Sequence, residues 1–264
     1  MCRHRRQNRG DMRRIIFSKR IGKELLRDPL SYIFCLGFPL VMLLIMTVVN
    51  QSIPPEAGMT VFQIQSLAPG VALFGLTFVM LFTCIQVSKD RSSAFLTRLY
   101  ASPMKALDFL GGYTLPTLVI SVAQIIITFI VAIIIGRLSS YEFQIINTIL
   151  CILVLLPSAL LFISFGLFFG TLLNDKAAPG ICSIIISAAS ILGGVWMDVD
   201  SLTGTFKTIC QVLPFYQGVS AARNAIQGNY TELVKPLAII LVYAIVIYIL
   251  SSLLFQRKMQ NDLK

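Results

Sequence analysis

The stretch YTLPTLVISVAQIIITFIVAIIIG, residues 113–136, contains no Asp, Glu, Lys or Arg. An α-helix rises about 1.5 Å per residue, so a run of this length covers the roughly 30 Å of hydrocarbon in a bilayer. Five further uncharged apolar runs have a similar length: 30–49, 67–87, 145–173, 177–196 and 236–255. The sequence therefore predicts an all-α integral membrane protein with six transmembrane helices.

The composition supports one membrane domain. Hydrophobic residues make up 56% of the 264 residues and charged residues 13%, whereas soluble domains carry about 25% charged residues. We expect a basic N-terminal segment at 1–29, a six-span domain at 30–255 and a short tail at 256–264. No segment between the runs is long enough for a separate soluble catalytic domain, so we do not expect an enzyme.

Basic residues predict the orientation of the chain. Of the 22 Lys and Arg residues, 18 fall in the two terminal segments and in the second and fourth loops. Positively charged loops are retained on the cytoplasmic side, so we expect a cell-membrane protein with both termini in the cytoplasm. The net charge of +10 is then explained by retention and by anionic membrane lipids as partners, and we expect no nucleic-acid partner.

Residues that could bind a metal or a nucleotide are scarce. The six cysteines lie mostly inside apolar runs, form no CxxC pair and are accompanied by a single histidine, His4. This pattern supports neither a metal site nor a disulfide framework, and we expect the cysteines to be small packing residues. The phosphate-binding pattern GxxxxGK[ST] is absent from the sequence, so we expect no cofactor bound by this chain.

The segment before the first run predicts an amphipathic helix. Phe17, Ile21 and Leu25 recur at four-residue spacing, with basic side chains grouped on another side. Such a helix lies in the cytoplasmic membrane interface. Asp28 and Pro29 then end it, because the residue before proline is disfavoured in the helical conformation. A basic tail that only sets the orientation is the alternative.

The second loop, 88–108, is the one cytoplasmic loop long enough to contact another protein. Ser92 and Ser93 can cap a short helix with an apolar row and basic flanks, which suits docking into a groove. A connector resting on lipid headgroups is the alternative. The residues expected to make the contact are Arg91, Phe95, Leu96, Arg98, Leu99 and Pro103.

Between the fifth and sixth runs, 202–213 and 215–228 predict two short helices, neither long enough to span the membrane. They form either a re-entrant hairpin or a pair that lies on the membrane surface. We expect Arg223 to hold this region by bonding to carbonyl groups or to Asp198 or Asp200. The residues assigned to this outer gate are Pro214, Phe215 and Arg223.

Two runs carry rows of small or polar residues at helical spacing. The row in the third run is a candidate substrate path, because uncharged donors and acceptors can receive an amphipathic molecule. The row in the fifth run permits close approach of another helix. Packing within the protein or in a homodimer is the alternative for each row. The third-run residues are Thr117, Ser121, Gln124 and Thr128, and the fifth-run residues are Gly180, Ser183, Ser187, Ser190 and Gly194.

The uncharged runs also bear on the energy source. Proton- and sodium-coupled carriers generally need an ionisable or cation-binding group near the midplane, and the six runs contain no charged residue. If transport is active, we expect the energy to arrive through a partner protein, with the second loop as the contact.

Several short motifs occur in a characteristic order. AFLTRLYASP stands at 94–103, GG at 193–194 and LPFY at 213–216, and these are followed by Arg223 and Gly228. Their order resembles that of permease subunits of ATP-binding-cassette (ABC) type-2 exporters, especially the daunorubicin-resistance-like branch. The sequence departs from that pattern at 88–93, SKDRSS, where relatives often have an acidic stretch.

The resemblance implies a homo- or heterodimer of permeases bound to two ATPase subunits, which would use ATP and Mg. It makes 91–103 the coupling helix seated in the ATPase and 202–228 an outer re-entrant gate. The implied function is export of an amphipathic or hydrophobic compound such as a drug, an antibiotic or a lipid-like molecule. Export of a polysaccharide or teichoic acid is the alternative within the class, and a passive channel or membrane scaffold is the alternative outside it.

Overall fold

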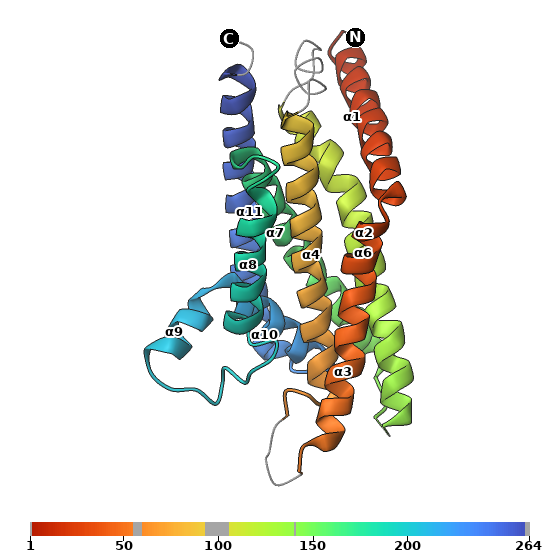
Figure 1. Ribbon diagram of the computed structural model, residues 1–264, viewed down its shortest axis with the longest axis vertical. Coiled ribbons are helices and arrows are strands. Elements are labelled where there is room, and N and C mark those ends of the chain that lie inside the picture. The colour runs from red at the N-terminus through yellow and green to blue at the C-terminus, as the bar shows by residue number, and fades with distance from the viewer. Residues whose placement is uncertain (1, 55–59, 93–105, 140, 262–264) are drawn as a thin grey trace.

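Long helices dominate the computed structural model of the chain, which describes residues 2–54, 60–92, 106–139 and 141–261, with side chains from Ile15 to Gln260. The helices run side by side, and both ends of the chain lie at the same end of the bundle, here the termini end (Figure 1). The opposite end is the far end. The elements in chain order are α1 (Cys2–Arg27), α2 (Pro29–Tyr32), the π-helix η1 (Ile33–Gly37), α3 (Phe38–Ser52), α4 (Ile64–Ser92), α6 (Ala106–Leu138), α7 (Ile145–Leu172), α8 (Ala178–Leu192), α9 (Thr205–Val212), α10 (Pro214–Gln227) and α11 (Tyr230–Asn261).

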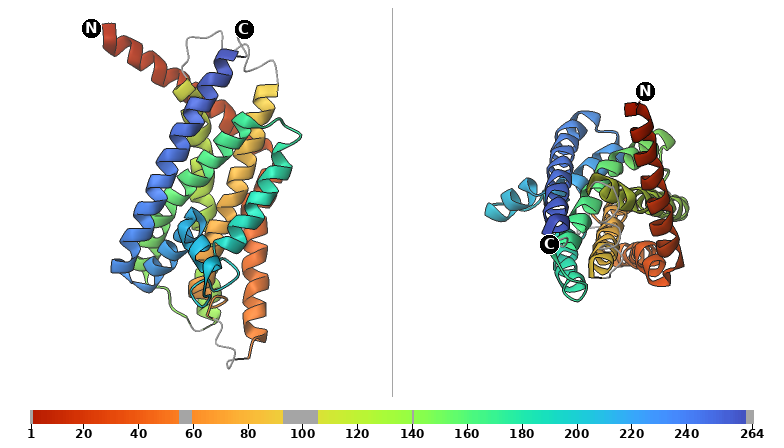
Figure 2. Two further views of the ribbon diagram at one scale, coloured as in Figure 1. Left: turned by 90° about the vertical axis from the view of Figure 1, so that its left-hand side faces the viewer. Right: turned by 90° about the horizontal axis from the view of Figure 1, so that it is seen from above.

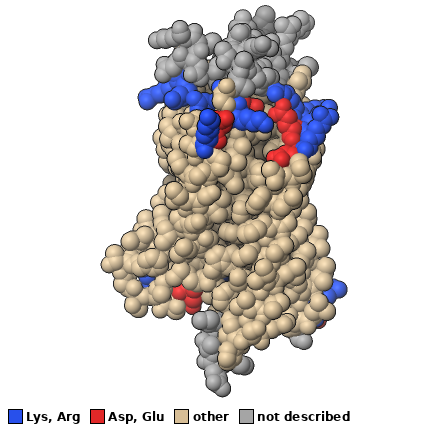
Figure 3. Space-filling view, viewed as in Figure 1, with Lys and Arg blue, Asp and Glu red and all other residues tan. Residues whose placement is uncertain are grey.

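Five helices in the described part of the chain are long and apolar enough to cross a membrane. They are the continuous helical segment Pro29–Ser52 together with α4, α6, α7 and α11. The chain is therefore a multi-pass membrane protein. Lys and Arg gather at the termini end, and the middle of the visible surface is free of charge (Figure 3).

The prediction of six full-length spans is confirmed for only five, because α8 has 15 residues. At about 1.5 Å per residue it extends roughly 22 Å, less than the hydrocarbon thickness. The helix ends because Gly194 adopts a φ of +69°, which glycine reaches without a steric penalty. Val195 and Trp196, expected at the end of the fifth span, lie beyond the helix.

α4 is the central helix. Most of the residues in its apolar segment are buried, whereas those of the first and last spans are largely exposed. It packs closely against α7 because Gly166 and Gly170 lack side chains. A Cβ at Gly166 would lie 2.6 Å from the Met80 carbonyl oxygen, and one at Gly170 would lie 2.7 Å from the Cys84 carbonyl oxygen. Gly166 and Gly170 thus form a GxxxG contact within the chain.

The first span begins with a defined cap. The Asp28 carboxylate accepts hydrogen bonds from the Leu30 backbone N–H at 3.2 Å and from the Ser31 hydroxyl at 2.7 Å, and Pro29 occupies the first helical turn. These bonds satisfy donors that a helix start leaves free. The expected break at Asp28 and Pro29 is confirmed.

The N-terminal helix α1 crosses the termini end obliquely (Figure 2). Its apolar row Phe17, Ile21 and Leu25 is buried and belongs to the core of the bundle. The pattern of this row predicts a position in the membrane interface, but in the structure protein covers it. Among its described side chains, the exposed large apolar residues are Ile15, Ile16 and Leu26, at 50%, 62% and 64%.

The predicted pair of short helices is present as α9 and α10, which are joined by an extended Leu213. The two helices lie in different environments. α10 is largely buried and packs against α4, α7 and α11 at the far end. α9 projects away from the bundle (Figure 1), and Cys210 is its buried residue.

Candidate functional site

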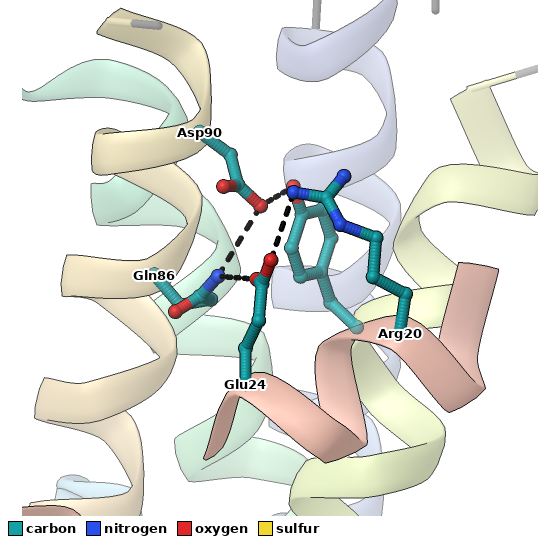
Figure 4. A network of polar contacts seen from close by, with 5 residues as sticks. Arg20, Glu24, Gln86 and Asp90 are labelled. Carbon is teal, nitrogen blue, oxygen red and sulfur yellow. Dashed lines mark hydrogen bonds and ion pairs between the residues drawn. The ribbon is translucent and has the colours of Figure 1, made fainter. Parts of the chain in front are cut away.

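A buried polar cluster joins α1, α4 and α6 at the termini end (Figure 4). At its centre Asp90, on α4, is 6% exposed. The Tyr113 hydroxyl donates a 2.8 Å hydrogen bond to Asp90 Oδ2. A buried carboxylate is costly unless it is paired or hydrogen-bonded, so this bond stabilises the α4–α6 contact. The polar cluster consists of Arg20, Glu24, Gln86, Asp90 and Tyr113.

Gln86 connects the α1 and α4 members of the cluster. Its Nε2 donates to Glu24 Oε2 at 2.9 Å and to Asp90 Oδ2 at 3.4 Å. Arg20 pairs with Glu24 at 2.8 Å along α1, and its positive charge also acts favourably on Asp90. The three helices are therefore held together by charge-assisted bonds in a partly dry setting, where such bonds are stronger than in water.

Aromatic packing supports the polar cluster from the side. The Phe17 ring lies edge-on to Tyr113 at 5.1 Å and to Phe109 at 5.6 Å between centroids. A Cβ at Gly112 would overlap the Phe17 ring, so the glycine admits it. This arrangement fixes the Tyr113 side chain and its hydroxyl.

Most of the residues expected to contact an ATPase are not described by the structure. Phe95, Leu96, Arg98, Leu99 and Pro103 lie outside the described residues. Arg91 is described, and its guanidinium donates to the carbonyls of Thr171 and Gly170, the latter at 3.4 Å. These carbonyls stand at the end of α7, where a helix leaves acceptors free. α4 is therefore attached to α6, α1 and α7 immediately before residue 93.

The row proposed as a substrate path is buried in the observed conformation. Thr117, Ser121, Gln124 and Thr128 are each 3% exposed or less. Thr117 and Ser121 donate to carbonyls one turn earlier on their own helix, and Gln124 Nε2 donates to Thr128 Oγ1 at 3.2 Å. All four therefore have local partners.

Gln124 still has an unsatisfied acceptor. Its Oε1 is buried and has no hydrogen-bond partner among the described residues. Its amide lies against Gly75 on α4, where any Cβ would overlap it, and Pro39 of the first span lies close to the same point. A buried unpaired acceptor costs roughly 1–3 kcal/mol. Gln124 therefore offers a free acceptor to a donor group that enters between these helices.

The row predicted in the fifth run is partly exposed and partly buried. Ser183 and Ser187 are exposed, and no atom lies within 4 Å of a Cβ placed on Gly180. Ser190 and Gly194 are buried. Within the chain the buried residues of α8 are Ala178, Cys182, Ala189 and Ser190. The exposed half of the row is open to contact from outside this chain.

At the far end Arg223 connects α10 to two other elements. Its Nε donates to the Ser66 carbonyl on α4 at 3.1 Å, and its Nη2 lies 3.5 Å from the Val195 carbonyl, just beyond α8. Bonding to carbonyls is one of the two expected arrangements. Burial lowers the Arg223 pKa to about 10, although the carboxylates of Asp198 and Asp200 favour its charged form. Arg223 therefore remains charged at neutral pH.

Neighbours of Arg223 complete the far end. Pro214 starts α10, and the buried Phe215 ring stacks against Phe162 at 6.0 Å. The Tyr216 hydroxyl donates to Asp200. Burial of the Tyr216 side chain, together with the Asp200 carboxylate beside it, raises the Tyr216 pKa. A cavity of about 340 Å³ beside these residues is lined by Asp198, Asp200, Tyr216, Ser220, Arg223 and Glu232, among others.

Metal-binding geometry is not found in the part of the chain that the structure describes, where no three His, Cys, Asp or Glu side chains could hold an ion. Five of the six cysteines have described side chains, and these five are buried, as expected of packing residues.

Comparison with known proteins shows the family to which this membrane protein belongs. ABC-2 family transporter proteins match the chain over residues 47–253. The chain belongs to the ABC-2 transporter family. A protein that carries the name transport permease YvfS, from Bacillus subtilis (strain 168), is 23% identical over 231 residues, which are 87% of this chain and 91% of that protein. The chain is thus a membrane component of an ABC-2 type transporter.

Sequence reasoning on this ABC-2 permease missed the polar cluster. In the sequence Asp90 stands in the SKDRSS stretch and Tyr113 begins the third run, whereas no pattern marks Glu24 or Gln86. A signal was present, because Asp90 continues the helical register of the second run and is the one acid near its end. An acid there needs a buried partner if the helix extends past the run.

Proposed function

We propose that this ABC-2 permease is the transmembrane subunit of an ATP-driven exporter that moves an amphipathic or hydrophobic compound out across the cell membrane. The observation that carries the proposal is the polar cluster, which binds α1 and α6 to the end of α4 directly before residues 93–105. Family membership supplies the transport function. The concentration of basic residues at the termini end supports a cytoplasmic location for that end.

The energy source in this proposal is a separate pair of ABC ATPase subunits, which bind ATP and Mg. Residues 91–103 form the contact, with Phe95 and Leu99 as apolar anchors. A force applied there acts on α4 and α6 together, because Tyr113 and Asp90 join them. α7 would move with them, because Arg91 donates to carbonyls at the end of α7 and Gly170 lets α7 pack closely against α4.

α4 is the element proposed to carry this motion across the membrane. Asp90 and Ser66 lie near opposite ends of one continuous helix, about 36 Å apart at 1.5 Å per residue. The Ser66 carbonyl accepts from Arg223 on α10. A shift of α4 at the ATPase side therefore changes the contact that holds the far-end helix, which is the proposed gate at 202–228.

The path itself is proposed to form with a second permease, either another copy or a homologue. The exposed Ser183 and Ser187 on α8 and the open space at Gly180 support such a contact. Gln124, with its free acceptor, is the proposed cargo contact within the membrane. The uncharged lining favours amphipathic cargo over ions.

Affinity purification from the native membrane tests this proposal. The full chain is compared with a double variant, Phe95→Asp and Leu99→Asp, and proteins that copurify are identified and assayed for ATP hydrolysis. We expect a soluble P-loop ATPase with the wild type and its loss with the double variant. Recovery of an intact chain without an ATPase would support a passive channel or a scaffold instead.

A further inference from the structure

A second cavity at the far end has a different lining from the one beside Arg223. It lies between the end of α3, the start of α4 and the end of α6, and has a volume of about 470 Å³. Small-molecule sites commonly measure about 300–1,000 Å³. Among the described residues, no Asp, Glu, Lys or Arg lines it, although charged residues line the neighbouring cavity. Its principal lining residues are Asn50, Gln51, Phe62, Gln63, Gln65 and Tyr141.

The carboxamides in this cavity retain free hydrogen-bonding groups. Gln65 Nε2 donates to Gln63 Oε1 at 2.8 Å, which leaves the Gln63 amide N–H groups and the Gln65 oxygen available. The Asn50 and Gln51 side chains make no hydrogen bond with any described residue. Each carboxamide both donates and accepts. The cavity therefore presents several neutral donor–acceptor groups at close spacing.

The Tyr141 ring is held in place at the edge of the cavity. Its backbone N–H donates to the Gly136 carbonyl at 2.8 Å, in the turn that ends α6. The ring lies edge-on to Phe143, with centroids 4.9 Å apart. Phe143 in turn lies against Gly136, where a Cβ would come within 2.8 Å of the ring. A fixed aromatic ring loses little freedom when a ligand stacks on it.

We propose that this cavity binds a neutral sugar ring. A sugar presents hydroxyl groups that donate and accept, which match carboxamides, and a face of C–H groups that suits the negative face of an aromatic ring. A charged ligand would meet no opposite charge among the described lining residues, and a wholly apolar ligand would leave the carboxamides unpaired. The binding site stands without reference to transport; that the sugar belongs to the cargo rests on the proposed function.

Saturation-transfer NMR on the full chain in nanodiscs tests the site directly, with maltose and cellobiose as probes and a blocked tri-alanine peptide as the competing ligand class. We expect saturable transfer to a disaccharide and little to the peptide. Tyr141→Ala and Gln63→Ala should each weaken sugar binding about fivefold or more, and Tyr141→Phe should retain most of it. Gln256→Ala, at an exposed glutamine near the other end of the chain, is the matched control.

Three results would overturn this assignment: no saturable transfer from either disaccharide, equal binding by Gln63→Ala and Gln256→Ala, or tighter binding of the peptide. Gln63 is exposed, so its variant remains informative if Tyr141→Ala fails to fold. Because the assay contains no ATPase, sugar binding without a copurifying ATPase would leave this site in place while the exporter proposal fails.

Discussion

Replacing Tyr113 with Phe removes one hydroxyl from the polar cluster and leaves the ring in place. The lost bond is the 2.8 Å donation to Asp90, a carboxylate that is 6% exposed. A hydrogen bond to a charged group contributes about 1.5–3 kcal/mol to stability. One kcal/mol shifts the Tm of a domain of this size by about 2–4 °C, so we expect Tm to fall by about 3–12 °C.

The assay is thermal unfolding in nanodiscs, followed by fluorescence of the single tryptophan, Trp196. Trp196 reports on the bundle because its ring lies 5.3 Å from Phe74. Tyr243→Phe is the matched control, since the Tyr243 hydroxyl makes a longer, 3.3 Å bond to the Val212 carbonyl near the surface. We expect that control to change Tm by about 2 °C or less.

A double-mutant cycle with Asp90→Asn separates the bond from other effects of each change. We expect the two substitutions to be non-additive by about 1 kcal/mol or more, because the residues touch. Equal Tm values for Tyr113→Phe and Tyr243→Phe, or full additivity with Asp90→Asn, would refute the role assigned to the polar cluster.

Three further substitutions test the other parts of the account. Gly170→Ala places a Cβ 2.7 Å from a backbone oxygen of α4, so we expect it to lower the free energy of unfolding by about 1–3 kcal/mol. The control Gly37→Ala, whose Cβ would have no atom within 4 Å, should not lower it. Equal stabilities of the two variants would contradict close α4–α7 packing. Gln124→Leu removes a buried unpaired acceptor, so we expect unfolding free energy to rise by about 1 kcal/mol while export falls; unchanged transport of every compound tested would exclude a cargo contact. Arg223→Ala should lower both Tm and export, and Arg223→Lys should restore part of each; wild-type folding and export in the alanine variant would exclude its role at the gate.

Residue pattern alone predicts the long spans of this permease, because hydrocarbon excludes charge and sets a minimum helix length. It fails at α8, where the apolar run continues through Gly193 and Gly194 but the backbone turns at a positive φ. Hydropathy records which residues tolerate lipid and carries no information on backbone conformation. The cap at Asp28 was predictable because it depends on adjacent residues only.

The candidate site was less predictable, since its members come from distant parts of the chain. Gln86 and Glu24 are 62 residues apart in sequence, and Arg91 and Thr171 are 80 apart. Helical periodicity identifies the face of a helix but not what covers it. For Phe17 and Ile21 the cover is protein rather than lipid, and for Ser183 the face is open within this chain.

The most direct test of the account is whether ATP at the termini end changes access to the far end. A Ser220→Cys variant places a thiol in the cavity beside Arg223, and the native described cysteines are buried. The complex with its copurified ATPase, in proteoliposomes, is labelled with a membrane-impermeant maleimide with and without ATP and vanadate. The account predicts that nucleotide changes the labelling rate and that Tyr113→Phe with Asp90→Asn reduces this change. A labelling rate that does not respond to nucleotide in the active wild-type complex would contradict it.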